Sequence, residues 1–223
     1  FYHEPIVHCA AVAHPAPASA LVIGGGDGGS SEELLKHRGM RRVVRAELDP
    51  EVVRVAKRHL QRVHRGVWDD PRLQVHIGDG FEFTRDTGER FDLIVFDLTD
   101  PDTPARRLYT AEFFRIAREA LAPGGAISLH LGSPVFQPQR VRALLAELSS
   151  VFRTVRPLGT YVPLYGAYWG MAVASDAIDP AVLEPADVEA RLAERGVADL
   201  QLYNGDVHRA LFALPNFYRH LLG

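Results

Sequence analysis

A buried apolar strand that runs directly into a glycine-rich loop constrains the fold of this chain more than any other feature. The apolar residues 21–23 lead into residues 24–29, which read Gly-Gly-Gly-Asp-Gly-Gly, and a helical pattern follows at residues 31–37. A strand, a glycine loop and a helix in this order form the place where open α/β sheets bring the backbone close to a nucleotide-like ligand. The spacing of Gly24 and Gly26 alone is a weak signal, because plain turns also carry it.

Short apolar strands alternate with amphipathic helical segments along the first two thirds of the chain. The strands are predicted at residues 19–24, 42–48, 73–77, 91–96 and 126–131. The helices are predicted at residues 31–37, 51–63, 113–121 and 138–151. This alternation predicts an α/β fold with a mostly parallel twisted sheet and helices on both of its faces.

The last third of the chain has a different pattern. Residues 154–164 and 169–175 are β-rich and only a hairpin-like connection separates them, which predicts an antiparallel hairpin at the edge of the sheet. Short helices are predicted at residues 185–195 and 207–214. The chain contains no internal repeat and no low-complexity linker, so residues 1–223 are expected to form one domain.

Composition excludes several classes of partner. The chain has 223 residues, 47% of them hydrophobic, which is enough to bury a full core. Its 25 basic and 28 acidic residues give a net charge of −3, which argues against nucleic acid as a partner. No apolar run approaches the ~18 residues that span a bilayer, and no signal-peptide pattern opens the chain, so no membrane partner is expected. The single cysteine fits a reducing cytoplasm.

Local sequence also assigns structural roles to several side chains. Ser30 or Ser31 is expected to cap the helix that follows the glycine loop. Arg42 and Arg45 are interpreted as solvated residues on the flanks of strands and helices. Cys9 is interpreted as a small buried side chain and not as a nucleophile.

Acidic residues end two further predicted strands. Glu47 lies about 20 residues after the glycine loop, the spacing at which an acid accepts both hydroxyls of a ribose. Asp79 follows the third strand and could accept a hydrogen bond from an adenine amino group. Each acid alone is better explained as a helix cap, but a glycine loop and acids on successive strands together predict an adenosyl pocket.

Asp27 is unusual because it places an acid inside the glycine loop. Such loops attract anions through their N–H groups and the helix dipole, whereas an acid there suits an ammonium group. S-adenosylmethionine carries an ammonium and a carboxylate at this end, and its decarboxylated form carries only the ammonium. The decarboxylated donor is therefore the better electrostatic match.

Asp97 and Asp100 follow a wholly apolar strand and lie three residues apart. An aliphatic amine has a pKa near ~10 and is mostly protonated at neutral pH, so it needs a group that takes its proton before it attacks. One carboxylate can accept this proton while the second holds the far end of a diamine. Because a sulfonium is already an activated leaving group, no metal and no further cofactor are expected.

These residues resemble the polyamine aminopropyltransferases, the spermidine synthase family. The resemblance extends over nearly the whole chain, and the glycine-aspartate loop together with the Asp-x-x-Asp-Pro element at residues 97–101 is specific to this family and its close relatives. The further matching segments are Tyr2-His3-Glu4 with His8, Glu47-Leu48-Asp49, Gly78-Asp79-Gly80, Pro104, Tyr109, Val162-Pro163-Leu164-Tyr165, Tyr203-Asn204, His208 and Leu214-Pro215.

The resemblance implies a methyltransferase-like Rossmann fold and the transfer of an aminopropyl group from decarboxylated S-adenosylmethionine to a polyamine, with release of methylthioadenosine. It implies a single catalytic domain in which the small N-terminal β-domain of the family is absent, a homodimer or higher homo-oligomer, and a cytoplasmic location. Asp97 matches the proton acceptor. The amine contacts match Asp100, His3 and Asp27, with Tyr2, Tyr109 and Tyr165 lining the amine channel. The methylthioadenosine contacts match Glu47, Asp79, Gly80 and Pro104, beside the loop glycines Gly24 and Gly26.

Three departures from the family pattern leave the acceptor open. Glu32-Glu33 replaces the usual Arg-Glu, His130 occupies a position commonly held by Gln, and the loop after Tyr165 is one residue shorter. A putrescine-like diamine is the first expectation, with cadaverine, agmatine and spermidine as alternatives. An N-methyltransferase that uses S-adenosylmethionine and a non-catalytic polyamine-binding protein are the competing functions.

Overall fold

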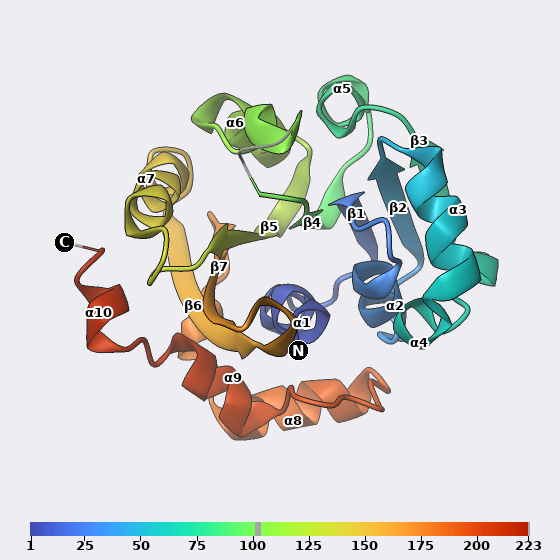
Figure 1. Cartoon of the computed structure of the whole chain (residues 1–223). Coiled ribbons are helices and arrows are strands. Elements are labelled where there is room, and N and C mark those ends of the chain that lie inside the picture. Colours follow the sequence, from blue (N-terminus) through green and yellow to red (C-terminus); the bar gives the residue numbers. More distant parts are fainter. Residues whose placement is uncertain (101–103, 223) are drawn as a thin grey trace.

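A computed structural model describes residues 1–100 and 104–222 and places one seven-stranded sheet at the centre of the molecule (Figure 1). The strand order is β3-β2-β1-β4-β5-β7-β6. The first five strands are parallel, and β7 runs antiparallel to both β5 and β6. The strand bounds are β1 Ser19–Gly24, β2 Arg42–Glu47, β3 Leu73–Ile77, β4 Phe91–Asp97, β5 Leu121–Gly132, β6 Thr154–Val162 and β7 Ala167–Ser175. This arrangement confirms the predicted mostly parallel sheet with an antiparallel edge hairpin.

Helices cover both faces of the sheet, because alternate side chains of each central strand point to opposite sides. On one face α5 Gly80–Asp86, α6 Ala111–Glu119 and α7 Pro138–Ser149 pack on a core that includes Leu21 and Ile23. On the other face lie α1 His3–Ala13, α2 Gly29–Leu35, α8 Pro185–Glu194 and α9 Gly205–Phe212, around Ala20 and Val22. The remaining helices are α3 Pro50–His59, α4 Gln61–His64 and α10 Asn216–Arg219. Short 3-10 turns occupy Val67–Asp69, Pro104–Leu108, Pro163–Tyr165 and Pro180–Val182.

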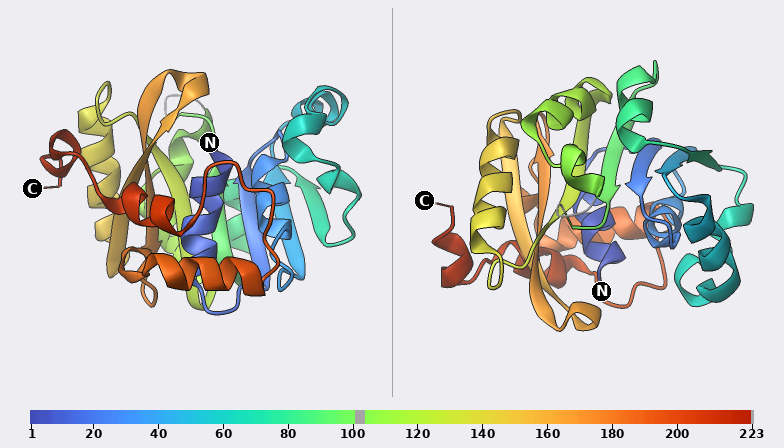
Figure 2. Two further views of the ribbon diagram at one scale, coloured as in Figure 1. Left: turned by 90° about the horizontal axis from the view of Figure 1, so that it is seen from below. Right: turned by 45° about the horizontal axis from the view of Figure 1, so that its top comes forward.

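Helix α1 is the main element that the sequence pattern did not predict. It is buried from Glu4 to Ala13 and lies between the sheet and helices α8 and α9 (Figure 2). A helix that is buried on all sides has no solvent-facing polar stripe, so it gives no clear amphipathic period to detect. Its position matters for the site, because its first turn brings Tyr2 and His3 to the end of strand β4.

Several predicted boundaries are corrected by the structure. The predicted helix at 51–63 breaks at Leu60 into α3 and α4, and the helix at 113–121 ends at Glu119 because β5 already begins at Leu121. The seven-residue α5 and the four-residue α10 were not predicted. In the described part of the chain, no helix combines the length and apolar character needed to cross a bilayer.

Candidate active site at the carboxyl ends of the strands

The carboxyl ends of β1, β2, β3 and β4 border a cavity of about 650 Å³. Parallel register sets this edge, since Gly24 lies opposite Asp97 and Glu47 opposite Ile77. Ligands of open α/β sheets bind at this edge. Eight of the residues singled out from the sequence line the cavity, namely Gly24, Gly26, Asp27, Glu47, Asp79, Gly80, Asp97 and Tyr165.

The glycine loop lies so close to the end of β4 and to α3 that Gly24 and Gly26 have no room for a side chain. Gly24 has φ +80°, and a Cβ there would lie 2.4 Å from the carbonyl oxygen of Asp97. A Cβ on Gly26 would lie 2.1 Å from Val52 Cγ1. The loop is further fixed by the Gly25 N–H, which donates to the Asp97 carbonyl at 2.6 Å. Glycine at these two positions therefore lets the backbone itself line the cavity, where any other residue would place a side chain.

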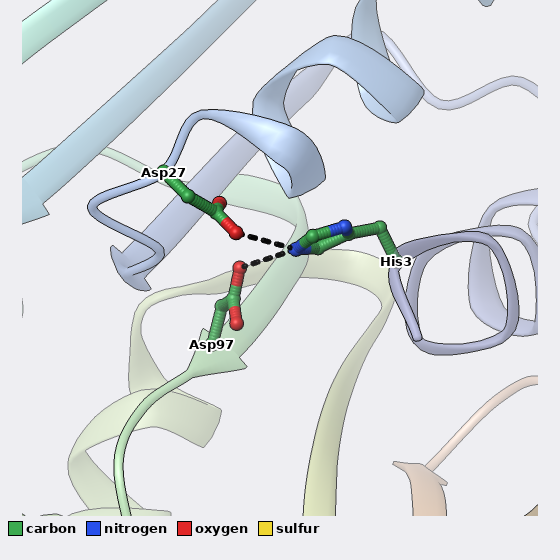
Figure 3. A group of neighbouring side chains, drawn as sticks. All are labelled: His3, Asp27 and Asp97. Atoms are coloured by element: carbon green, nitrogen blue, oxygen red, sulfur yellow. Dashed lines mark ion pairs between the residues drawn. The ribbon is translucent and has the colours of Figure 1, made fainter. Parts of the chain in front are cut away.

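His3, Asp27 and Asp97 meet at one end of the cavity (Figure 3). His3 Nε2 lies 3.1 Å from Asp27 Oδ2 and 3.8 Å from Asp97 Oδ2. Asp27 Oδ1 also accepts a hydrogen bond from the N–H of Gly29, the first residue of α2, at 2.9 Å. Three segments far apart in the sequence, the start of α1, the glycine loop and the end of β4, thus converge on one charged cluster.

The charges in this cluster depend on one another. Burial raises the pKa of Asp97, and Asp27 adds to that rise, while His3 and a hydrogen bond from Ser30 oppose it. Burial alone would lower the pKa of His3, but its hydrogen bond to Asp27 and the charge of Asp97 raise it. For Asp27 the contacts with His3 outweigh burial, so its pKa is lowered. These contacts favour the protonated form of His3 and give Asp97 a stronger proton affinity than Asp27.

Glu47 and Asp79 both line the cavity, yet their local roles differ. Asp79 is a helix cap, as the alternative interpretation required, because its Oδ1 accepts from Phe81 N at 2.8 Å. Its Oδ2 lies 3.4 Å from Arg107 Nη1. Glu47 caps no helix: its Oε1 accepts from Asp49 N at 3.1 Å, and Asp49 itself caps α3. Capping and lining the cavity are therefore compatible for Asp79.

Aromatic side chains line one side of the acidic cluster. Tyr2 and Tyr165 lie 6.1 Å apart between ring centroids, and Tyr165 lies 4.6 Å from Trp169. The tip of the β6–β7 hairpin supplies Tyr165 and extends past the end of the sheet toward the N-terminus (Figure 2). Behind them Tyr109 Oη lies 2.6 Å from His130 Nε2. Apolar rings beside carboxylates suit an alkyl amine, whose methylenes are apolar and whose ends are charged.

Asp100 and Pro104 lie at the limit of the described chain. Asp100 Oδ2 is 3.1 Å from Arg140 Nη1, so an arginine from α7 shares this acid. Pro104 begins a 3-10 turn, but its side chain and residues 101–103 lie outside the described residues. The predicted contact of Pro104 stays a prediction.

Sequence reasoning missed or misplaced three side chains at the site. Ser30 is not a helix cap, since Gly28 holds that position, and its hydroxyl instead donates to Asp97 Oδ2 at 2.7 Å. Arg45 is fully buried and not a solvated flank. Arg107 lines the cavity beside Asp79. Only the fold joins Ser30 to Asp97 across 67 positions, so no local signal could have shown it.

His3, Asp27 and Asp97 also have the spacing of a metal site, with one possible ligand atom from each lying within 4.8 Å of the others. Mixed nitrogen and oxygen donors of this kind could accommodate Zn²⁺ or another transition metal. His3 also forms an ion pair with each of the two acids. Their geometry therefore accounts for their positions without a metal and does not select one.

Comparison with known proteins gives consistent matches. The family model of the spermine/spermidine synthase domain matches residues 1–182. A polyamine aminopropyltransferase of Nitrosomonas europaea is 51% identical over 222 residues, which cover 100% of this chain and 68% of the relative. Polyamine aminopropyltransferase 2 of Hyperthermus butylicus is 38% identical, with 100% of this chain and 73% of the relative covered.

Solved structures extend the likeness to three dimensions. A spermidine synthase in complex with the transition state analogue AdoDATO superposes with a TM-score of 0.91 at 33% identity, covering 100% of this chain and 75% of that one. The spermidine synthase of Thermotoga maritima gives a TM-score of 0.87 at 32% identity, with 100% and 73% covered. These neighbours confirm the methyltransferase-like fold.

Proposed function

The chain belongs to the spermine/spermidine synthase domain family, an enzyme class that transfers aminopropyl groups to polyamines, and from this premise we propose its donor, its acceptor and the roles of its residues. The donor is decarboxylated S-adenosylmethionine and the acceptor is a diamine of the putrescine type. The products are the extended polyamine and methylthioadenosine.

The donor lies along the carboxyl ends of the strands. Glu47 accepts the ribose hydroxyls and Asp79 receives the base, while Gly24, Gly26 and Gly80 leave space for the nucleoside. Asp27 receives the ammonium of the donor at the cluster with His3, 3.1 Å away. The cavity of about 650 Å³ is within the size range of pockets for such ligands.

The acceptor enters along Tyr2, Tyr109 and Tyr165, and its far ammonium lies near Asp100. Its reacting nitrogen loses a proton to Asp97 and attacks the methylene carbon bonded to the sulfonium. The new C–N bond forms as the C–S bond breaks, and the electron pair of that bond neutralises the sulfur. Because the leaving group is already cationic, the proposed step requires no metal and no further cofactor.

The single observation that carries this proposal is one cavity lined both by Asp27 and Asp97, which follow or end β1 and β4, and by Glu47 and Asp79, which end or follow β2 and β3. A nucleoside with a cationic tail fits acids at both ends. A carboxylate on that tail would lie near Asp27, whose pKa is lowered and which is therefore ionised at neutral pH.

Mass spectrometry of the products decides between the functions. The protein is given the decarboxylated donor with putrescine, cadaverine, agmatine and spermidine together, and in a second reaction S-adenosylmethionine with the same amines. We expect an aminopropylated diamine and methylthioadenosine in the first reaction only. Methylated amine in the second reaction would overturn the proposal in favour of the N-methyltransferase, and unchanged amines in both would favour a binding protein.

A further inference from the structure

Arg45 is a fully buried arginine beneath the glycine loop. It lies on β2 two residues before Glu47, so both side chains point to the sheet face that carries α1 and α2. Its Nε donates to the Gly24 carbonyl at 3.1 Å, and its Nη2 donates to the Gly25 carbonyl. The guanidinium also lies 4.6 Å from the ring centroid of Trp68.

A buried guanidinium is costly, so its surroundings must compensate it. Burial lowers the pKa of Arg45, and three acids oppose this effect. Glu47 raises the pKa of Arg45 more than Asp97 and Asp27 do. Arginine remains protonated even with a lowered pKa of this kind, because its ordinary pKa exceeds 12. The site therefore contains a permanent buried cation within reach of the three carboxylates that the proposed function uses.

The contacts of Arg45 extend to the reacting acid through the backbone. The Gly25 carbonyl accepts a hydrogen bond from Arg45, and the Gly25 N–H donates to the Asp97 carbonyl at 2.6 Å. A Cβ on Gly25 would lie 2.8 Å from Asp97 Oδ2, so the loop packs directly against the carboxylate. Gly25 has φ +64°, a conformation that glycine adopts without strain. A guanidinium can hold the carbonyls of two successive residues because its donors form a rigid fork.

We propose that Arg45 is a positioning residue of the transfer site, which clamps the Gly24–Gly25 turn onto β2 and places a fixed positive charge beneath the turn that packs against Asp97. The inference deepens the proposed function and rests on it for the reaction. The clamp itself rests only on the contacts of Arg45, which hold whatever ligand the cavity binds.

The clamp has an electrostatic consequence at Asp97. The groups that act on this carboxylate are His3 from α1, Asp27 and Ser30 from the glycine loop and α2, and Arg45 from β2. Of these, His3 and Arg45 are the two cations. Removal of Arg45 leaves His3, whose charge itself depends on pH, so the pKa of Asp97 should rise further.

Two substitutions of Arg45 separate the clamp from the charge. Arg45→Met keeps much of the side-chain volume but loses both the charge and the donors. Arg45→Lys keeps the charge but replaces the fork with a single ammonium. Arg41→Met is the control, because Arg41 is exposed immediately before β2.

The readouts are methylthioadenosine affinity by calorimetry and the titration of the Asp97 carboxyl carbon by NMR in the ligand-free protein. For Arg45→Met we expect an affinity about tenfold weaker and an Asp97 midpoint at higher pH. For Arg45→Lys we expect weaker affinity with an Asp97 midpoint near that of the unmodified protein. Arg41→Met should leave both unchanged.

An Asp97 midpoint and an affinity that are both unaltered in Arg45→Met would overturn the proposal. If that variant does not fold, Arg45→Lys still tests the proposal, because an unaltered affinity of Arg45→Lys for methylthioadenosine would refute the clamp. Neither readout requires turnover. An unmodified protein that transfers no aminopropyl group, yet shows the Asp97 shift in Arg45→Met, would refute the proposed function and leave the clamp intact.

Discussion

At the scale of single residues, Asp97 has the environment of a base that must be desolvated and still remain ionised. Its side chain is only 10% exposed, at the end of a strand that is apolar from Leu93 to Phe96. Burial favours its protonated form, and His3 and Ser30 favour the carboxylate. A carboxylate with a raised pKa is a better proton acceptor than one in water, provided that neighbouring groups keep it charged.

Asp97→Asn tests this role because it keeps the shape of the side chain and removes its basicity. We expect single-turnover aminopropyl transfer at saturating donor to fall by ~100-fold or more, the scale of general acid–base catalysis. Donor affinity should change little, because the nucleoside contacts lie on other strands. Asp206→Asn is the control, since this aspartate is 85% exposed on α9. A rate close to that of the unmodified protein would limit Asp97 to positioning the amine.

Ser30 and Ser31 form a matched pair of adjacent buried hydroxyls. Ser30 Oγ donates to Asp97 at 2.7 Å, whereas Ser31 Oγ has no hydrogen-bond partner in the part of the chain that the structure describes. The bond from Ser30 stabilises the carboxylate, so Ser30→Ala should raise the pKa of Asp97 further. The acid limb of the kcat/KM profile should therefore move to higher pH in Ser30→Ala and stay in place in Ser31→Ala. Equal profiles in the two variants would contradict the role of Ser30.

Asp27 should determine the choice of donor. His3 lowers the pKa of Asp27, so Asp27 is ionised at neutral pH and repels the carboxylate of S-adenosylmethionine. Binding measured by calorimetry should favour decarboxylated S-adenosylmethionine over S-adenosylmethionine, and Asp27→Asn should narrow this preference by ~10-fold, about the effect of one lost charge interaction at the protein surface. Equal affinities in the unmodified protein would refute the electrostatic argument.

At the scale of elements, α1 joins distant parts of the chain. Glu4 accepts the N–H groups of Gln201, Leu202 and Tyr203 at 2.7 to 2.9 Å, which ties the first turn of α1 to the segment before α9. His8 Nε2 lies 2.9 Å from Glu33 Oε2, which ties the same helix to α2. His3 depends on both ties for its position, because it begins the helix.

Glu4→Gln should weaken this attachment. The amide keeps one acceptor oxygen and turns its nitrogen toward backbone donors, so at least one charge-assisted hydrogen bond is lost. The free energy of unfolding should fall by about 2 kcal/mol, as for a buried hydrogen bond to a charged group. Urea unfolding followed by circular dichroism measures the loss, with the exposed Glu51→Gln as the control. Equal urea midpoints for Glu4→Gln and Glu51→Gln would mean that apolar packing alone holds α1 in place.

The elements also show what a sequence can and cannot specify. The sequence pattern identified all seven strands, because short apolar or β-rich runs between turns carry the signal of a strand. It missed α1, which is buried on all sides, and α5, whose seven residues are too few to show a period. The cavity residues were found because acids at strand ends and glycine loops are local patterns. Arg45 and Ser30 were misplaced because burial and pairing across the sheet are properties of the folded chain.

At the scale of the whole molecule, buried histidines should control stability against acid. Burial lowers the pKa of four of them below the ordinary 6.5, and that of His37 to about 2. The four are His14, His37, His130 and His208. In the unfolded chain these side chains take up protons as pH falls below 6.5, whereas in the folded chain their lowered pKa values delay this uptake to lower pH. The unfolded state then binds more protons, so the free energy of unfolding falls as pH falls.

Three groups, His3, Glu32 and Asp97, act in the opposite direction, because the pKa of each is raised in the folded chain. The raised pKa of His3 adds stability that is present below pH 6.5 and is lost as pH rises through its folded value. Glu32 has a pKa raised to about 7, so its contribution is likewise present at low pH and lost as pH rises through 7. The four histidines outnumber these three groups, and the lowering of the His37 pKa is large. The net slope should therefore favour unfolding on the acid side.

Urea unfolding at pH 7.5, 6.5 and 5.5 measures this slope. We expect the free energy of unfolding to decrease between pH 6.5 and 5.5, with about 1 kcal/mol of that decrease from His37 alone, because each unmatched proton contributes up to ~1.4 kcal/mol per pH unit. His37→Gln should be less stable at pH 7.5, since it loses the 3.1 Å contact with His8, but its slope should be shallower. His59→Gln is the control, because His59 is exposed on α3. A slope that is the same in both variants would show that His37 takes up its proton in the folded protein, and the acid sensitivity would then have to come from the carboxylates.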